Sequence, residues 1–284
     1  MKKHPLLRPA LAVPFTPDPI AQFFRRQGSS GLQQDEIAEL PEVIRAILSK
    51  PVSFYEEMAK QKPQPGDRPL TNVAFVLDGS GSMETGKDAT IEGFNKQVSV
   101  ARAGAKEAGE TTFTDVQFAT EVSVRCVAKS IDELEPLTEE TYKPDGWTAL
   151  YDAMGDTVAA LLGTPRIDSP LTATLVTLFT DGKENVSSRY TADVLSELIK
   201  RLEATGRWTF ALVGPKGSVG TLAETLSVKK GNVKGYNPSS VHERQEVFGA
   251  MASASTTYMA SRSVGATQSA SFFADVPQGA DKTP

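Results

Sequence analysis

Cysteine and histidine are nearly absent from this sequence, and each shortage excludes a class of site. Cys126 is the single cysteine among 284 residues, so an intramolecular disulfide and a zinc site built from thiolates are both excluded. The two histidines are His4, in a proline-spaced opening, and His242, near the start of the last predicted helix. Neither is well placed to act as the general base of a serine hydrolase.

Long apolar runs and an excess of basic charge are missing as well. No uncharged stretch reaches the roughly 20 residues that a membrane-spanning helix needs. Pro5, Arg8, Pro9 and Pro14 interrupt the apolar opening before it could form the core of a signal peptide. The formal net charge of -5 offers no basic surface for nucleic acid or an anionic membrane. We therefore expect a cytoplasmic protein with no nucleic-acid or membrane partner, whose binding depends on a local site.

Three regions differ in composition. Residues 1–70 predict an N-terminal extension with one helical segment, at about 34–49, and a linker rich in proline and lysine. Residues 71–262 contain most of the apolar periodicity and form the predicted main domain. Residues 263–284 are small and polar, which predicts a flexible C-terminal tail in which Phe272 and Phe273 are possible anchors.

Strands and helices alternate through the main domain, which favours an α/β fold. The two strands at 111–118 and 121–127 are joined too tightly for a crossover helix, so they predict an antiparallel hairpin. We predict a doubly wound, mostly parallel sheet with one antiparallel edge strand and helices on both faces. The other expected strands are 71–78, 171–179, 208–213 and 232–236, and the expected helices are 85–108, 148–162, 191–204, 219–226 and 239–261, the last with Val241, Val247, Phe248 and Met251 buried.

Oxygen-bearing side chains follow the strands of this predicted sheet. Asp78 ends the first strand, and the glycines after it let the chain turn so that Asp78, Ser80 and Ser82 surround one point. Asp181 ends another apolar strand, and Thr148 opens a helix. Ligand sites in such sheets lie at the carboxyl ends of the strands. Hard oxygen ligands without histidine or thiolate favour Mg²⁺, Mn²⁺ or Ca²⁺ over zinc or copper.

Three segments carry a specific resemblance. Asp-Gly-Ser-Gly-Ser at 78–82, Gly-Trp-Thr-Ala-Leu-Tyr-Asp-Ala at 146–153 and Phe-Thr-Asp-Gly at 179–182 resemble the three-part metal-ion-dependent adhesion site (MIDAS) of von Willebrand factor A-type (VWA) domains. The resemblance covers about residues 71–262 and implies a Rossmann-like fold. It implies that Asp78, Ser80, Ser82, Thr148 and Asp181 hold Mg²⁺, some of them through water.

The resemblance also implies what the site does. In the family the site is not catalytic, and an Asp or Glu of a partner protein fills an open coordination position. Intracellular relatives often work beside AAA-type ATPases or within larger assemblies, and in relatives that switch, metal engagement shifts the last helix. Around the site we expect a rim formed by Met83, Trp147, Lys183 and Glu184, with Trp147 standing where the family often has a second glycine.

An enzymatic alternative uses the same loop. Residues 81–87, Gly-Ser-Met-Glu-Thr-Gly-Lys, match a phosphate-binding P-loop as far as Lys87, which makes a P-loop-like NTPase the runner-up. The next position should be Ser or Thr but is Asp88, whose carboxylate would repel phosphate. A dinucleotide fingerprint fails because Glu84 stands where a glycine is required.

Overall fold

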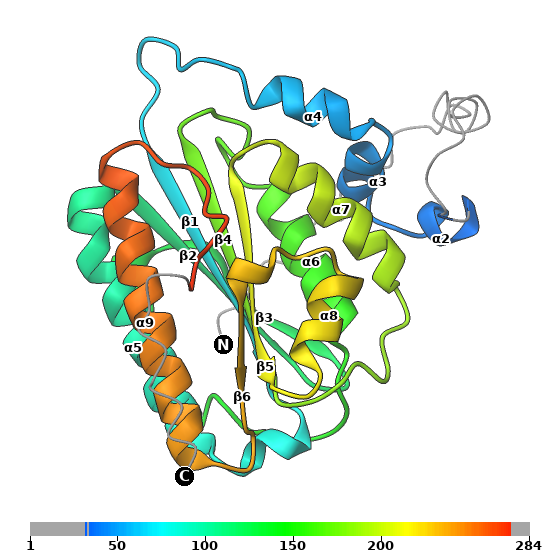
Figure 1. Cartoon of the computed structure of the whole chain (residues 1–284), viewed down its shortest axis with the longest axis vertical. Coiled ribbons are helices and arrows are strands. Elements are labelled where there is room, and N and C mark those ends of the chain that lie inside the picture. The colour runs from blue at the N-terminus through cyan, green and yellow to red at the C-terminus, as the bar shows by residue number, and fades with distance from the viewer. Residues whose placement is uncertain (1–31, 33, 274–284) are drawn as a thin grey trace, which may run out of the picture. The chain divides into compact units, whose positions relative to one another are not determined.

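A mostly parallel sheet forms the centre of the computed structural model, which describes Leu32 and residues 34–273. Within the described residues six strands pair in the order β3-β2-β1-β4-β5-β6 (Figure 1). Every pairing is parallel except that of β2 with β3, which is an antiparallel hairpin with an irregular register. The predicted fold class is confirmed. The strands are β1 (Leu70–Asp78), β2 (Glu110–Phe118), β3 (Val122–Ser130), β4 (Thr172–Phe179), β5 (Trp208–Pro215) and β6 (Val233–Tyr236).

The strand order reverses at β1. After β1 the chain builds β2 and β3 on one side, then returns to place β4 on the other side. All nine residues of β1 are buried, as expected for a central strand covered on both faces. Its last residue, Asp78, is in register with Phe118 of β2, and Leu77 is in register with Phe179 of β4. The reversal therefore places the end of β1 where α/β sheets bind their ligands.

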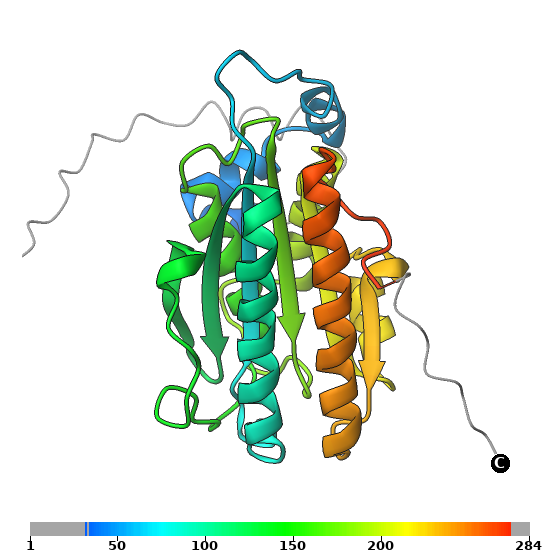
Figure 2. The same ribbon diagram turned by 90° about the vertical axis from the view of Figure 1, so that its left-hand side faces the viewer.

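Two layers of helices enclose the sheet. On one face α5 (Lys87–Ala108) and α9 (Val241–Ser263) run side by side (Figure 2). The other face is covered by α6 (Leu150–Leu162), α7 (Ala192–Ala204) and α8 (Val219–Thr225) (Figure 1). The apolar core divides accordingly into one cluster on each face of the sheet. On the α5 and α9 face, the rings of Phe179 and Phe248 stack with their centroids 4.4 Å apart.

Helix α9 differs from its prediction at one position. Val247, Phe248 and Met251 are buried as expected, but Val241 is 48% exposed, so that part of the prediction is wrong. Val241 is the first residue of the helix, and the buried part of α9 begins only at Arg244. The buried side chain of the first turns is instead Arg244. Its periodicity with Phe248 and Met251, at i, i+4 and i+7, places it on the same face of the helix.

The segment before β1 contains more helix than predicted. The expected helical segment at 34–49 is divided at Pro41 into α2 (Gln34–Ala38) and α3 (Glu42–Leu48), and α4 (Val52–Met58) was not predicted. Ile44 and Leu48 join the core on the α6 and α7 face, so the apolar side of α3 packs against the main domain. Residues 1–31, including His4 and the proline-spaced opening, lie outside the described residues.

The chain beyond α9 packs back on the domain as far as it is described. Phe272 and Phe273 are buried, and the backbone N–H of Phe273 donates to the Gly231 carbonyl at 3.0 Å. The rest of the predicted tail, residues 274–284, lies outside the described residues. In the part of the chain that the structure describes, no helix is both long enough and apolar enough to cross a membrane.

Candidate metal site

The carboxylate of Asp78 lies buried at the end of β1 and is held from both sides. Its Oδ1 accepts a hydrogen bond from the backbone N–H of Ser80 at 2.7 Å, and its Oδ2 accepts one from Thr180 Oγ1 at 2.6 Å. Burial raises the pKa of the Asp78 carboxyl, while the hydrogen bonds from Thr180 and Ser80 act in the opposite direction. The backbone carbonyl of Asp78 accepts from the Tyr142 hydroxyl at 2.6 Å. This carboxylate is thus fixed before any ligand arrives.

The structure brings the side chains of the five predicted ligand residues together from three loops. Ser80 Oγ lies 3.2 Å from Ser82 Oγ, and Ser82 Oγ donates to Asp181 Oδ1 at 2.5 Å. Thr148 lies close to the same point, because a Cβ atom built on Gly182 would be 3.3 Å from Thr148 Oγ1 and 3.7 Å from Asp78 Oδ2. A side chain at 182 would therefore crowd the point where the oxygens converge. That these residues bind a metal stays a prediction.

The loop that presents Thr148 is tied to both of its neighbours. The N–H of Thr148 donates to Asn185 Oδ1 at 2.8 Å, and the N–H of Asn185 donates to the Thr148 carbonyl at 3.1 Å. Gly146 adopts a left-handed backbone with φ 77°, and a Cβ there would lie 2.4 Å from Thr120 Oγ1. The same hydroxyl accepts from the N–H of Trp147. Glycine at 146 is therefore required, although the family's usual second glycine is replaced.

Of the four residues predicted to form the rim, Trp147 and Lys183 are exposed, Glu184 is partly exposed and Met83 is buried. Trp147 is 65% exposed, and Lys183 is exposed in the loop after β4. The prediction for Met83 is wrong: its side chain is fully buried beneath the loop, and its sulfur accepts from Arg244. Glu184 is partly exposed, but its carboxylate accepts four hydrogen bonds that hold the loop and α6 together. The donors are the N–H groups of Tyr151, Val186 and Ser187 and the Ser187 hydroxyl.

Arg244 belongs to this site and was missed by the sequence analysis. Its guanidinium is fully buried and donates to Asp181 Oδ2 at 3.2 Å from Nη2. The sequence offered one signal, which is that Arg244 falls on the apolar stripe of α9 with Phe248 and Met251. A charged residue on an apolar stripe requires a buried partner. The partner, Asp181, is 63 residues away in the chain, so the local pattern around Arg244 does not identify it.

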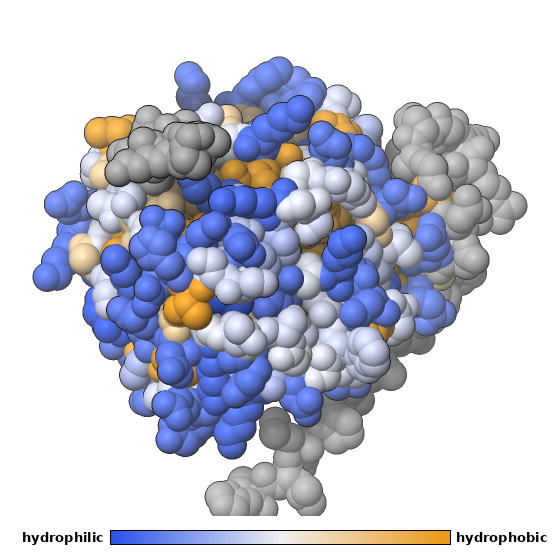
Figure 3. Space-filling view, turned by 60° about the horizontal axis from the view of Figure 1, so that its bottom comes forward, coloured by the Kyte–Doolittle hydropathy of each residue, from blue (hydrophilic) through white to orange (hydrophobic). Residues whose placement is uncertain are grey.

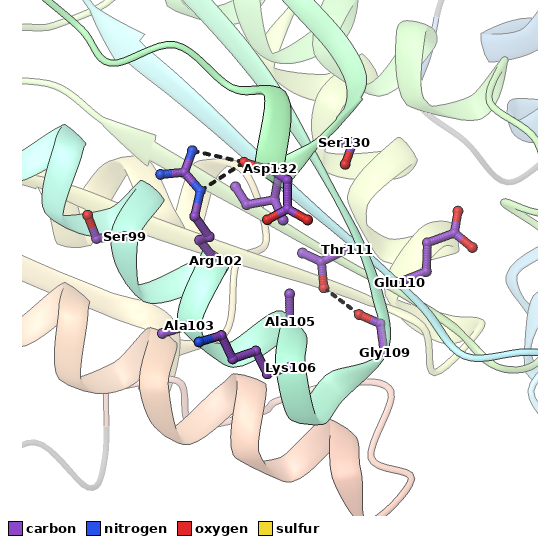
Figure 4. A pocket seen from close by; sticks show the side chains of 11 residues that line it. Ser99, Arg102, Ala103, Ala105, Lys106, Gly109, Glu110, Thr111, Ser130 and Asp132 are labelled. Carbon is purple, nitrogen blue, oxygen red and sulfur yellow. Dashed lines mark hydrogen bonds between the residues drawn. The ribbon is translucent and has the colours of Figure 1, made fainter.

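One pocket adjoins the candidate metal site, and another lies far from it. A cavity of about 320 Å³ adjoins it, between the Gly182–Lys183 turn and the β5–α8 connection, where Val219 and Leu222 give it an apolar wall. The face of the molecule at the carboxyl ends of the parallel strands is mostly hydrophilic, with small separate hydrophobic spots (Figure 3). A larger pocket, of about 630 Å³, lies at the opposite end of the sheet, near Thr111 at the start of β2 (Figure 4). Its Arg102 is already bonded to the Ile131 and Leu134 carbonyls.

Two backbone N–H groups of the loop at 81–87 are already bonded within the protein. Residues Gly81–Glu84 form a short 3₁₀ helix, η1. The N–H of Gly81 donates to the Gly146 carbonyl at 3.1 Å, and that of Met83 donates to the Ser80 carbonyl at 3.0 Å. A P-loop instead directs successive backbone N–H groups at the anion. The N–H groups of Gly81 and Met83 are therefore not available to a phosphate in this arrangement.

The donor set fits a hard divalent cation. Two carboxylates, from Asp78 and Asp181, and three hydroxyls converge without imidazole or thiolate. Among the described residues, no three His, Cys, Asp or Glu side chains gather into a metal-binding group. A cation at this edge would therefore depend on hydroxyl oxygens and water to complete its coordination shell.

Comparison with known proteins supports the fold and nothing beyond it. No protein-family model and no curated protein matches the sequence. Among solved structures, the pilus adhesin SpaC from Lactobacillus rhamnosus GG matches with a TM-score of 0.51 and 12% identity, over 70% of this chain and 32% of that one. At this level of identity the likeness shows a shared fold alone.

Two further solved structures match with lower TM-scores. A von Willebrand factor type A protein from Catenulispora acidiphila gives a TM-score of 0.43 at 16% identity, covering 66% of this chain and 43% of that one. Proximal thread matrix protein 1 from the mussel byssus, with a zinc-occupied MIDAS motif, gives 0.46 at 19% identity, covering 65% and 45%. The chain spans less than two thirds of the length of each of these solved chains.

Proposed function

We propose that this protein is a non-catalytic, divalent-metal-dependent binding module that captures a carboxylate of a partner protein. The observation that carries the proposal is the convergence of the two carboxylates and three hydroxyls at the carboxyl end of β1. Asp78, Ser80, Ser82, Thr148 and Asp181 would hold the cation, directly or through water. Mg²⁺ is the metal we propose, and Mn²⁺ and Ca²⁺ share this ligand set.

The chain's own residues determine how such a site would work. Ser80, Ser82 and Thr148 contribute neutral oxygens, so only two negative charges face a doubly charged cation. The bound metal supplies a Lewis-acidic position that an outside anion can occupy. Asp78 is already oriented by Ser80 and Thr180, so little ordering remains when the ligand binds. An exposed Asp or Glu of a partner would then complete the shell, with Trp147 and Lys183 beside it.

The cellular setting is part of the proposal. Following the resemblance to intracellular VWA proteins, we propose a cytoplasmic role within a larger assembly or beside an AAA-type ATPase. The partner would be a protein that presents an Asp or Glu side chain. The apolar-walled cavity next to Gly182 lies where residues flanking that carboxylate would arrive.

A paired experiment tests this function. Mn²⁺ binding is measured directly by electron paramagnetic resonance, and partner capture is measured by pull-down in Mg²⁺ and in chelator. Ser82→Ala with Asp181→Ala should abolish both. The matched control, Ser253→Ala with Asp193→Ala, changes the same residue types at exposed helical positions and should change neither. If the unaltered protein binds no divalent cation, or if Lys87→Ala removes an ATP-binding signal in calorimetry, the proposal is wrong.

A further inference from the structure

The guanidinium of Arg244 is the meeting point of five segments of the chain. Nη2 donates to Asp181 Oδ2 at 3.2 Å and to the Pro238 carbonyl at 3.3 Å. Nη1 donates to Thr90 Oγ1 at 3.2 Å and to Met83 Sδ at 3.3 Å. These groups come from the β4 loop, the approach to α9, α5 and η1, and Arg244 itself comes from α9. A fixed positive charge is thus placed directly behind a proposed metal ligand.

The surroundings are shaped to accept this side chain. Gly86 has a left-handed backbone with φ 94°, and a Cβ there would lie 2.7 Å from Arg244 Nε. The guanidinium carbon lies 5.6 Å from the centre of the Tyr236 ring, within cation–π range. Among the described residues, Arg244 Nε is buried without a hydrogen-bond partner. The charge is therefore retained at the cost of one unsatisfied donor.

A charge count shows what the guanidinium does to the site. Asp181 is linked through Ser82 and Ser80 to Asp78, so the ionised groups of this network are two carboxylates and Arg244. With both carboxyls ionised, as metal binding requires, the network carries a net charge of -1. A divalent cation would bring it to +1, whereas without Arg244 the loaded site would be neutral. Arg244 therefore repels the metal and makes the loaded site more attractive to an anion.

We infer that Arg244 is a built-in counter-cation that weakens metal binding at this site and strengthens the capture of a carboxylate by the loaded site. The inference rests on the proposed function, because it assumes that the five oxygen-bearing residues hold a divalent cation. It assigns Arg244 an electrostatic role that is distinct from holding the loops together. A purely structural role would predict that every substitution weakens both kinds of binding.

The first test measures Mn²⁺ affinity by electron paramagnetic resonance. Arg244→Gln keeps a hydrogen-bond donor but removes the charge, and it should bind Mn²⁺ at least about tenfold more tightly than the unaltered protein. Arg244→Lys keeps the charge without the planar fork and should stay within about threefold. The matched control is Arg201→Gln, which replaces another buried arginine, paired with Glu197 on α7, and should leave Mn²⁺ affinity unchanged.

The second test uses acetate as the anion. Each protein is saturated with Mn²⁺, and acetate is titrated while water-proton relaxation reports the displacement of metal-bound water. Arg244→Gln should bind acetate about threefold more weakly at low salt, and Arg244→Lys should match the unaltered protein. Thermal unfolding of each variant, with circular dichroism, checks that the fold is kept. If Arg244→Gln does not fold, Arg244→Met, whose unbranched side chain follows the same path, replaces it in both tests.

The outcomes separate this inference from the proposed function. If the unaltered protein binds no Mn²⁺, the metal site itself is wrong and the inference fails with it. If the unaltered protein binds Mn²⁺ but the neutral variant binds it equally or more weakly, the metal site stands and the counter-cation role is overturned. The same holds if acetate binds the neutral variant as tightly as it binds the unaltered protein.

Discussion

Two carboxylate–arginine pairs, one between the two strands at one edge of the sheet and one at the candidate metal site, differ in their surroundings. Asp115 of β2 and Arg125 of β3 pair at 2.6 Å, with the aspartate fully buried and the arginine partly exposed. Asp181 and Arg244 pair at 3.2 Å, with the arginine fully buried and the aspartate shared with Ser82. The first pair is a closed contact between two neighbouring strands. In the second, which we call the open pair, the aspartate side chain is also buried, at 2% exposure, but one of its oxygens is bonded to the hydroxyl of the exposed residue Ser82.

The difference lies in what else each carboxylate touches. Asp115 Oδ1 is buried without a hydrogen-bond partner among the described residues, and its other oxygen is bonded to Arg125. Both oxygens of Asp181 have a partner: Arg244 bonds Oδ2, and the Ser82 hydroxyl bonds Oδ1. A cation could take the place of this hydroxyl as the partner of Oδ1. The two pairs therefore differ in the partner of the second carboxylate oxygen, and the burial of the two aspartates is similar.

The largest expected effect breaks the open pair. Asp181→Asn keeps the shape of the side chain and removes its charge, so Mn²⁺ affinity should fall by about a hundredfold or more. Asp115→Asn makes the same change in the closed pair and should leave Mn²⁺ affinity unaltered. Calorimetric titration of both variants measures the contrast. Equal losses in the two variants would show that the site responds to general destabilisation.

Breaking the closed pair should instead affect stability. Arg125→Ala leaves the buried Asp115 carboxylate unpaired, which should lower the free energy of unfolding by about 3 kcal/mol at pH 7. Urea unfolding measures the change, and Arg166→Ala, which breaks the more exposed pair with Glu110, is the control with an expected loss below about 1 kcal/mol. A loss for Arg125→Ala no larger than that of the control would contradict the closed, buried character of this pair.

The pH dependence of stability sharpens the comparison further. Burial raises the pKa of Asp115 to about 6, although Arg125 opposes the shift. The folded state then binds the proton more tightly than the unfolded state, whose carboxyl titrates near about 4. The contribution of Asp115 to stability is therefore greatest below about pH 4 and is lost as the pH rises to about 6, by about 2 to 3 kcal/mol in all.

Asp115→Asn isolates this contribution from that of other carboxyls. Urea unfolding of both proteins between pH 4 and pH 7 should show the unaltered protein gaining stability relative to the variant as the pH falls. A difference between the two proteins that does not change with pH would rule out a raised pKa for Asp115.

The smallest expected effect compares one exposed apolar side chain near each pair. Trp147→Ala should change the free energy of unfolding by less than about 0.5 kcal/mol, because its side chain is largely in solvent. It should still weaken metal-dependent partner capture, since exposed aromatics often anchor interfaces. Val124→Ala, on β3 near the closed pair, should leave capture unchanged. Equal capture by both variants and the unaltered protein would remove Trp147 from the rim.

The sequence predicted the fold because its signals were local. Apolar runs that end in polar turns located the strands, and the short connection at 119–121 identified the antiparallel hairpin. The same turns placed the three loops of the candidate site at one edge, since parallel strands end there together. The helix at Val52–Met58 was missed because its seven residues are too few for an apolar periodicity to stand out.

The errors at the site concern the directions of side chains. Met83 is in a polar loop but its side chain is fully buried, and the partly exposed Glu184 uses its carboxylate to bond backbone N–H groups of its own loop. Arg244 contacts Asp181 because α9, which follows the last strand in the sequence, packs along α5. No local pattern encodes such a meeting. Sequence reasoning therefore found which residues converge at the strand ends and missed the charge behind them.

The position of β1 has a consequence for folding. Because β1 pairs with β2 on one side and β4 on the other, the oxygens of Asp78 and Asp181 come together only after the crossover between the two halves of the sheet is complete. Of the five candidate ligand residues, only Asp78, Ser80 and Ser82 are close together in the sequence. A cation that requires all three loops would bind the native state alone and stabilise it by mass action. Metal binding would then be a measure of the fully formed sheet. At Mg²⁺ concentrations above the dissociation constant, the unfolding temperature would rise with the logarithm of the Mg²⁺ concentration.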